Sequence, residues 1–424
     1  MKVQGWKVDL DTLEVSEDWN FAETKEDRVH KIHAYPAKFP AFLTTKAISY
    51  ARESGLEINT IGDVFCGCGT VAYEAKKANI NFWGCDINPV ATLIAEVKSS
   101  TYKVASIRTM MDDIMEVYDR QVAEYADLDM SLVLGRIKYW YTDNSIMHLT
   151  YLKNAIHEVK KRDSKYKRFF LVAFSNILKA SSRWLTKSIK PTIDKNKKEI
   201  DIRKAYVKQV KSMMKAFEES SIDNDIKPDI NTKNVLKTAN DEVQLDLVVT
   251  SPPYVTSYEY ADLHQLSTLW LDYVTDFRDL RKGTIGSVYD VEDFKKDVKH
   301  LNKTGEHIVF QLYNQDKARS KSAARYYVDM QKVVNISYDK LNDDGYAVFV
   351  IGNTEYKGVR IDNTQHLMEA MYAEGFRNLE VIKRKISNKI LTPYRDKSGK
   401  FTNSSTGRKI YAEEFIVIGK KERA

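Results

Sequence analysis

The sequence is poor in the residues that disulfide frameworks, collagen-like repeats and membrane spans require. Its 424 residues include only 3 cysteines, 8 prolines and 17 glycines, which argues against a collagen-like, low-complexity or disordered polymer. No apolar run approaches the roughly 18 residues of a membrane span, and the N-terminus has no apolar signal-peptide core. We therefore expect a soluble globular protein that stays in the cytoplasm and has no membrane partner.

Disulfide and metal frameworks are also missing. Cys66, Cys68 and Cys85 form an odd, closely spaced set, which fits reduced thiols better than disulfides. His30 and His33 could be two metal ligands, but no third ligand cluster accompanies them. We expect no disulfide and no metal site.

The positive charge is concentrated in one part of the chain. The net charge is +7, and residues 151–240 hold 22 Lys+Arg against 10 Asp+Glu, whereas the rest holds 44 against 49. Such a patch attracts polyanions, nucleic acid first, through counterion release. A solvated, lysine-rich helical face is an equally good interpretation of the charge alone.

Apolar runs bounded by turn residues predict an α/β protein. Buried strands are expected at 60–65, 81–86, 245–250 and 346–351, the last after a turn at 342–345. Residues 71–79 place alanines on one side of a helix between the first two strands, which predicts a strand–helix–strand unit.

Three further segments set the predicted domain organisation. Residues 378–384 and 410–418 flank a polar stretch at 395–408 and favour an antiparallel pair, so the sheet should be mixed. Residues 101–240 read as a basic, mostly helical insertion, and about 272–329 as a second insertion. The chain would then consist of an N-terminal half at 1–100, the insertion at 101–240 and a C-terminal half at 241–424.

The segment Asp63-Val-Phe-Cys-Gly-Cys-Gly-Thr70 runs from a strand through a Gly-X-Gly turn into a helix. Gly67 and Gly69 allow the backbone to approach a ligand, and the helix start offers free N–H groups. Asp86 ends the next strand, near the spacing at which an acid binds the hydroxyls of a nucleotide ribose. Because a third glycine and a P-loop lysine are missing, a nucleoside-type cofactor is favoured over a dinucleotide or triphosphate. A tight strand-to-helix connection is the alternative.

The segment Ser251-Pro252-Pro253-Tyr254 follows the strand at 245–250. The two prolines stop strand pairing and project a hydroxyl and carbonyls from the carboxyl edge of the sheet, where open α/β sheets bind ligands. Two acceptors on one –NH2 group would localise its lone pair, and Tyr254 could stack on the base that carries it. Strand-ending prolines are also common as punctuation, but this four-residue sequence is more specific.

These segments together resemble the class I S-adenosylmethionine-dependent DNA methyltransferases that act on exocyclic amino groups. Residues 63–70 are similar to the family's cofactor glycine motif, Asp86 to its ribose-binding acid and 251–254 to its catalytic tetrad. Residues 33–39 are similar to the motif that packs on the methionine end of the cofactor. The resemblance covers roughly 28–100 and 241–420, less the second insertion.

The resemblance implies a Rossmann-like fold with a mostly parallel twisted sheet, a C-terminal antiparallel strand and a largely helical insertion. It implies S-adenosyl-L-methionine as cofactor. The residues that would bind it are Tyr35, Lys38, Phe39, Asp63, Phe65, Cys66, Gly67, Gly69, Thr70, Asp86 and Ile87. The tetrad Ser251, Pro252, Pro253 and Tyr254 would be catalytic.

In the family, serine at the first tetrad position is typical of cytosine-N4 enzymes, whereas aspartate or asparagine is usual for adenine-N6 enzymes. The resemblance therefore implies N4 methylation of cytosine in double-stranded DNA. The base would flip out of the duplex to reach the pocket. The candidate DNA contacts are Arg183, Trp184, Lys187, Arg278, Lys389 and Arg395. For Arg183 and Trp184, packing inside the insertion is an alternative.

Three other functions remain open from the sequence. The enzyme could methylate adenine N6 in DNA or an amine in RNA or tRNA. It could also be a nucleic-acid-binding protein on an inactive methyltransferase scaffold. A DNA-modifying enzyme of this kind is expected to belong to a restriction-modification or related defence system, in which it could pair functionally with a restriction endonuclease.

Overall fold

The structure is a computed structural model. It describes residues 1–20, 25–36, 38, 40–124, 128–220, 222, 224–255, 260–287, 289, 293–385, 394–395, 401–402, 408–409 and 413–423. No helix in these ranges is long and apolar enough to cross a membrane. The three cysteines are buried and unpaired.

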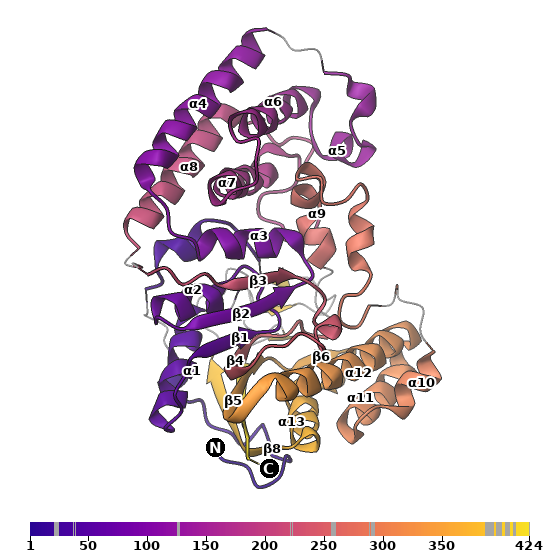
Figure 1. The fold of residues 1–424 in the computed structure, drawn as a ribbon. Coiled ribbons are helices and arrows are strands. Elements are labelled where there is room, and N and C mark those ends of the chain that lie inside the picture. Colours follow the sequence, from indigo (N-terminus) through magenta and orange to yellow (C-terminus); the bar gives the residue numbers. More distant parts are fainter. Residues whose placement is uncertain are drawn as a thin grey trace.

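Within the described ranges, a seven-stranded sheet has the order β3-β2-β1-β4-β5-β12-β8 (Figure 1). Its strands are β1 (Thr60–Asp63), β2 (Asn81–Asp86), β3 (Asp229–Thr232), β4 (Leu245–Thr250), β5 (Leu341–Ile351), β8 (Phe376–Lys385) and β12 (Glu413–Lys421). The pairs from β3 to β5 are parallel, and β12 is antiparallel to both β5 and β8. The expected mostly parallel sheet with a C-terminal antiparallel strand is confirmed.

One detail of the predicted strands needs correction. The turn expected at 342–345 lies inside β5, which begins at Leu341. Leu245 pairs with Leu341 and Leu247 with Tyr346, so β5 carries extra residues opposite β4. Asp344 takes a positive φ of 64°, which lets the strand bulge and continue. The turn residues thus bend a strand without ending it.

Helices cover both faces of the sheet, which gives the usual three layers. On one face, α1 (Ala41–Glu53) and α2 (Thr70–Lys77) pack on a cluster that includes Ile61, Leu247 and Val348. On the other face, α11 (Lys303–Gln315), α12 (Lys317–Lys340) and α13 (Asn363–Glu374) pack on a second cluster with Val248 and Phe349. The sheet is therefore buried on both sides.

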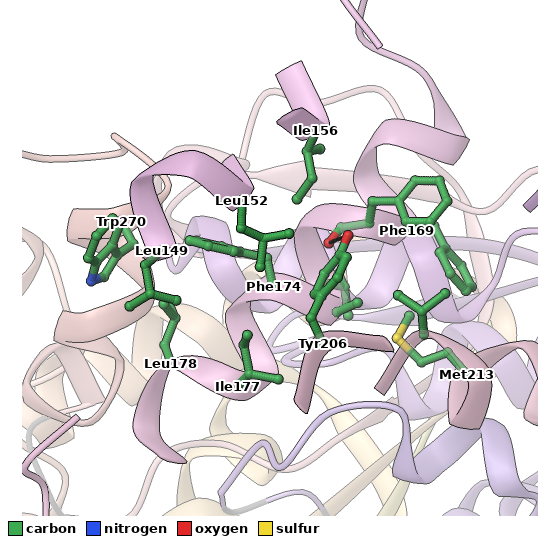
Figure 2. Close-up of a cluster of buried hydrophobic side chains, with 14 of the residues drawn as sticks. Leu149, Leu152, Ile156, Phe169, Phe174, Ile177, Leu178, Tyr206, Met213 and Trp270 are labelled. Carbon is green, nitrogen blue, oxygen red and sulfur yellow. Dashed lines mark hydrogen bonds between the residues drawn. The ribbon is translucent and has the colours of Figure 1, made fainter. Parts of the chain in front are cut away.

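The long helices of the first insertion form a separate bundle beyond α3 (Pro89–Lys98) (Figure 1). They are α4 (Val104–Ala123), α5 (Gly135–Trp140), α6 (Asp143–Val159), α7 (Lys165–Ser181) and α8 (Ile202–Glu218). Figure 2 shows Leu152 of α6, Phe174 of α7 and Tyr206 of α8 within its core, with Trp270 of α9 (Tyr260–Trp270) beside them. Because α3 and α9 belong to this cluster, the bundle shares its core with the sheet-bearing part.

β3 lies within residues 101–240, which the sequence predicts to be an insertion, yet it pairs with β2 in the central sheet. The strand is short and polar, DINT, so apolar periodicity gives no signal for it. The helical bundle accordingly ends with α8, before β3.

Shorter elements complete the described fold. They are the helices α10 (Phe294–Lys299), η1 (Glu17–Trp19), η2 (Arg28–Lys31), η3 (Met130–Leu132), η4 (Val235–Lys237) and η5 (Phe277–Arg281), and the strands β6 (Thr354–Tyr356), β7 (Val359–Ile361), β9 (Tyr394–Arg395), β10 (Phe401–Thr402) and β11 (Arg408–Lys409). The second insertion holds η5, α10, α11 and the first half of α12.

Candidate active site

The strand order reverses between β1 and β4, the place where open α/β sheets form a ligand-binding crevice. The glycine turn follows the carboxyl end of β1, and the Ser-Pro-Pro-Tyr corner follows that of β4. The last residues of these strands are joined, because Thr250 Oγ1 donates a 2.6 Å hydrogen bond to Asp63 Oδ1. The two corners are thus held side by side at one edge of the sheet.

Both corners line one pocket. Of the cofactor residues predicted from the sequence, the pocket is lined by Tyr35, Phe65, Gly67, Asp86 and Ile87. Of the tetrad, it is lined by Ser251, Pro253 and Tyr254. The two motifs therefore meet at one rim of the sheet.

The other predicted residues do not line the pocket or lie outside the described ranges. Those that are described but do not line it are Lys38, Asp63, Cys66, Gly69, Thr70 and Pro252. Gly69 is a packing residue, since it has a φ of 73° and a Cβ on it would lie 2.6 Å from Ala95 Cβ on α3. Phe39 lies outside the described residues.

Asp86 is held as a half-buried acceptor at the end of β2. Its Oδ2 accepts a 3.0 Å hydrogen bond from Gly67 N and its Oδ1 a 2.8 Å bond from Asn88 N. Burial raises the pKa of Asp86 to about 6, although these two backbone hydrogen bonds oppose the rise. A carboxylate has further lone pairs on both oxygens, so Asp86 can still accept hydrogen bonds from ligand hydroxyls.

Asp63 lies beneath the glycine turn and is 1% exposed. Burial raises its pKa to about 7; hydrogen bonds from Thr250 and Phe65 N lower it, and the nearby Asp86 charge raises it. No salt bridge to Asp63 or Asp86 occurs among the described residues. Two acidic groups with no cation between them suit a ligand that brings its own positive charge and hydroxyl donors.

Tyr35 lies beside the glycine turn, since a Cβ on Gly67 would be 3.9 Å from Tyr35 Cε1. Tyr35 lines the pocket and stacks on His264 of α9, with ring centroids 4.7 Å apart at 18°. Lys38 does not face the pocket, because its Nζ donates to Glu26 Oε2 at 3.0 Å and to His30 O at 2.8 Å. Lys38 thus fastens this part of the chain.

The two histidines once considered as metal ligands have other partners. His30 Nε2 lies 2.7 Å from Glu74 Oε1, and His33 Nε2 lies 3.0 Å from Ser175 Oγ. Burial lowers the pKa of His33 to about 3, so its ring is neutral. The described ranges contain no group of three His, Cys, Asp or Glu residues that could hold a metal ion.

The second half of the tetrad is fixed by two hydrogen bonds and one close packing contact. Tyr254 OH donates to Glu414 Oε1 at 3.1 Å, and its ring lies so close to Gly352 that a Cβ there would be 3.1 Å from Tyr254 Cε2. The carbonyl of Pro253 accepts a 2.8 Å hydrogen bond from Tyr326 OH of α12. Neither Tyr326 nor Glu414 was found from the sequence, because each lies far from the motif.

A third wall of the pocket comes from the second insertion, in which the sequence predicts only the DNA contact Arg278. Gly283–Ser287 lines the pocket. Asn234 Nδ2 donates to Gly283 O at 2.8 Å, and Ser322 Oγ donates to Gly286 O at 3.2 Å. Gly286 has a φ of 73° and packs on Tyr326. Gly283 and Gly286 were visible signals, but glycine spacing alone does not identify a binding wall.

Two of the candidate DNA contacts are packed within the helical bundle. The Trp184 side chain is 2% exposed and stacks on Trp140 with centroids 5.0 Å apart at 22°. Arg183 Nη2 donates hydrogen bonds to Lys138 O at 2.9 Å and to Tyr139 O at 2.7 Å. These contacts correct the expectation of direct DNA contact for Trp184 and favour the packing alternative for both residues.

The other candidate DNA contacts are placed differently. Lys187 is exposed. Arg278 is also exposed and forms a 2.5 Å ion pair with Asp276. Lys389 lies outside the described residues, and Arg395 is described only as part of the β9 backbone.

Comparisons with known proteins agree with the motifs. Residues 4–97 match the family model described as DNA methylase. The chain is 25% identical over 407 residues to the type II methyltransferase M.MvaI of Kocuria varians, spanning 90% of this chain and 89% of that protein. It is 24% identical over 312 residues to the type II methyltransferase M.BsoBI of Geobacillus stearothermophilus, spanning 66% and 60%.

Solved structures are less similar. The rRNA methyltransferase aviRa from Streptomyces viridochromogenes aligns with a TM-score of 0.26 at 10% identity, over 87% of this chain and 99% of that chain. A second structure of the same enzyme gives a TM-score of 0.28 at 9% identity, over 98% and 96%. Because these scores are too low to carry an argument, the fold assignment rests on the strand order.

Proposed function

We propose that this chain, as a class I DNA amino-methyltransferase, transfers a methyl group from S-adenosylmethionine to the exocyclic N4 amine of cytosine in double-stranded DNA. The observation that carries this proposal is that Gly67 and Ser251 line the same pocket. An amine donor and a methyl donor must meet in such a pocket for direct transfer.

The pocket residues suit the proposed cofactor. Asp86 would accept hydrogen bonds from the ribose hydroxyls, and the backbone at Gly67 would lie against the nucleoside. Ile87 and Tyr35 would provide apolar walls. When bound, S-adenosylmethionine supplies a methyl carbon made electrophilic by the adjacent sulfonium. The acidic pair Asp63 and Asp86 would offset that positive charge.

The tetrad would orient the target amine. Ser251 Oγ and a backbone carbonyl of Ser251 or Pro252 would accept hydrogen bonds from its two N–H groups and leave the nitrogen lone pair facing the methyl group. Tyr254 would stack on the base, which stabilises binding by about 1–3 kcal/mol in comparable contacts. Because the methyl group is already activated, these residues need only orient the amine and exclude water.

A base inside a duplex cannot reach this pocket, so the target would flip out, at a cost of a few kcal/mol. We propose that basic residues of 101–240 and of the second insertion hold the DNA backbone. Among the DNA contacts predicted from the sequence whose side chains the structure describes, Lys187 and Arg278 are exposed. The roles of the three predicted segments, cofactor half, DNA-binding insertion and catalytic half, remain part of this proposal.

Serine at the first tetrad position is the reason to prefer cytosine N4 over adenine N6. A hydroxyl can accept a hydrogen bond from either amine, so adenine N6 is the second candidate. The names of the relatives M.MvaI and M.BsoBI contain "type II methyltransferase". We therefore propose a role in a restriction-modification system, in which a partner endonuclease would cut unmodified DNA.

Labelled methyl transfer followed by nucleoside analysis tests the proposal. The protein is incubated with labelled S-adenosylmethionine and DNA from cells that lack it, and the digested nucleosides are separated. We expect label in N4-methylcytosine. Label in N6-methyladenine would show that adenine is the target base. Label that appears only when RNA is supplied would show that RNA is the substrate. Absence of cofactor binding in calorimetry would instead indicate an inactive scaffold.

A further inference from the structure

Three residues of α12 face the pocket along one side of the helix. Arg319, Ser322 and Tyr326 all line it, and their spacing of three and four residues puts them on one helical face. They belong to none of the motifs that indicate the family. This face of α12 is hereafter the α12 stripe.

The inner end of the α12 stripe is attached to the tetrad. Tyr326 is 3% exposed, and its hydroxyl donates to Pro253 O at 2.8 Å. Arg319 lies seven residues nearer the start of the helix, so the rise of 1.5 Å per residue puts it about 10 Å further along the axis. Arg319 is partly exposed, as expected for the outer end of the stripe.

The guanidinium of Arg319 has no carboxylate partner among the described residues. It lies over the Tyr356 ring, with the guanidinium carbon 5.3 Å from the ring centroid. The acid nearest in sequence, Asp316, has other partners: it accepts hydrogen bonds from Arg319 N at 3.0 Å, Tyr356 OH at 2.8 Å and Lys357 Nζ at 3.3 Å. The charged end of Arg319 can therefore bind an external anion.

The neighbouring arginines are occupied. Arg281 forms a 2.7 Å ion pair with Asp262 of α9, and Arg325 lies 3.1 Å from Asp329. The first pair fastens the second insertion to α9, and the second lies within α12. Lys233, which also lines the pocket, forms a 3.2 Å ion pair with Asp241. Among these basic groups, Arg319 is the one without an acidic partner.

We propose that Arg319 binds the backbone phosphate of the nucleotide whose base enters the pocket. The inference rests on the proposed function and adds an anion site that the family motifs do not include. A flipped nucleotide keeps its phosphate at the pocket mouth while its base lies at the tetrad. The planar guanidinium can bind two phosphate oxygens at once, and the Tyr356 ring supports it from one side.

The same guanidinium could instead bind the carboxylate of the cofactor, which is the other anion expected in this pocket. The two sources make different predictions. A phosphate contact affects DNA binding and its salt dependence, because each phosphate contact releases counterions. A carboxylate contact affects the affinity for the cofactor in the absence of DNA.

The test compares Arg319→Gln with Lys321→Gln. Lys321 is an exposed cation on the same helix that does not line the pocket, so its variant controls for the loss of one positive charge. For Arg319→Gln we expect the KM for DNA to rise about tenfold and the slope of log affinity against log salt to fall by about one. Calorimetry should show unchanged affinity for S-adenosylmethionine, and Lys321→Gln should match the wild type.

A methylphosphonate in place of a single phosphate locates the contact. The recognised site is first mapped in DNA from cells that express the protein, and the neutral linkage is then placed next to the target base. The loss of DNA affinity caused by the neutral linkage and the loss caused by Arg319→Gln should not be additive, because both changes remove the same contact. Arg319→Lys, which keeps the charge without the planar fork, should recover part of the affinity.

Three results would overturn the inference. The first is an Arg319→Gln variant that binds DNA like the wild type. The second is an affinity loss from Arg319→Gln that adds fully to the loss from every methylphosphonate near the target base. The third is an Arg319→Gln variant that binds the cofactor more weakly but has unchanged affinity for DNA. Failure of the proposed function is distinguishable, since the wild-type protein itself would then transfer no methyl group to DNA.

Discussion

Replacing Thr250 with valine should destabilise the protein more at high pH than at low pH. Thr250 Oγ1 donates a 2.6 Å hydrogen bond to Asp63 Oδ1 in a fully buried setting. Burial raises the pKa of Asp63 to about 7, and the hydrogen bond from Thr250 opposes that rise. Valine has a similar shape but cannot donate, so the pKa of Asp63 should rise further in the variant.

The sign follows from the direction of the shift. The folded-state pKa of Asp63 lies above the ordinary value of 3.8, so the stability that its protonated form confers is lost as pH rises through about 7. Near pH 5.5 the carboxyl is protonated, and Thr250→Val removes a neutral hydrogen bond of about 1 kcal/mol. Near pH 8.5 it is ionised, and the variant loses a bond to a charged group, about 1.5–3 kcal/mol.

Urea denaturation at both pH values measures this difference. Thr44→Val is the matched control, because Thr44 is fully buried in α1 and its hydroxyl makes no hydrogen bond in the described part of the chain. We expect Thr44→Val to leave the free energy of unfolding unchanged or higher at both pH values. A Thr250→Val loss that is independent of pH, or no larger than that of the control, would refute the buried charged contact.

Four further outcomes are expected. Ser251→Ala and Tyr254→Ala should abolish methyl transfer while calorimetry still detects S-adenosylmethionine; retained turnover would remove the catalytic assignment. Asp86→Ala should weaken cofactor binding. The affinity of the wild type for the cofactor should decrease as the pH drops below about 6, because the Asp86 carboxyl then becomes protonated. An affinity that does not change with pH would contradict this. Tyr326→Phe should lower kcat about fivefold with KM unchanged, since it frees the Pro253 carbonyl and a lost hydrogen bond is worth about 1 kcal/mol; an equal rise in KM would argue against positioning. Trp184→Ala should lower the free energy of unfolding by about 3–5 kcal/mol without changing the salt slope of DNA binding; a changed slope would indicate a DNA contact.

The parts of the fold that follow from local patterns were predictable. β2 and β4 have the predicted bounds, because short apolar runs between turn residues leave few alternatives. The pocket at the carboxyl ends of β1 and β4 follows from strand order and motif position together. The polar strand β3 was missed because only its pairing with β2 identifies it.

The parts of the site that depend on distant residues were not predictable. Tyr326 reaches Pro253 across 73 positions of sequence, and Glu414 reaches Tyr254 across 160. No local pattern reports such contacts. Trp184 was a candidate DNA contact because an Arg-Trp sequence suits both a DNA surface and a core, and only burial separates the two.

A crystal structure of the protein with S-adenosylhomocysteine would test the account most directly. We expect the ribose hydroxyls on Asp86, the nucleoside against the backbone at Gly67, and the sulfur turned toward the corner formed by Ser251 and Tyr254. A ligand bound outside this pocket, or one whose sulfur faces away from that corner, would contradict the claim that methyl donor and target amine meet between β1 and β4.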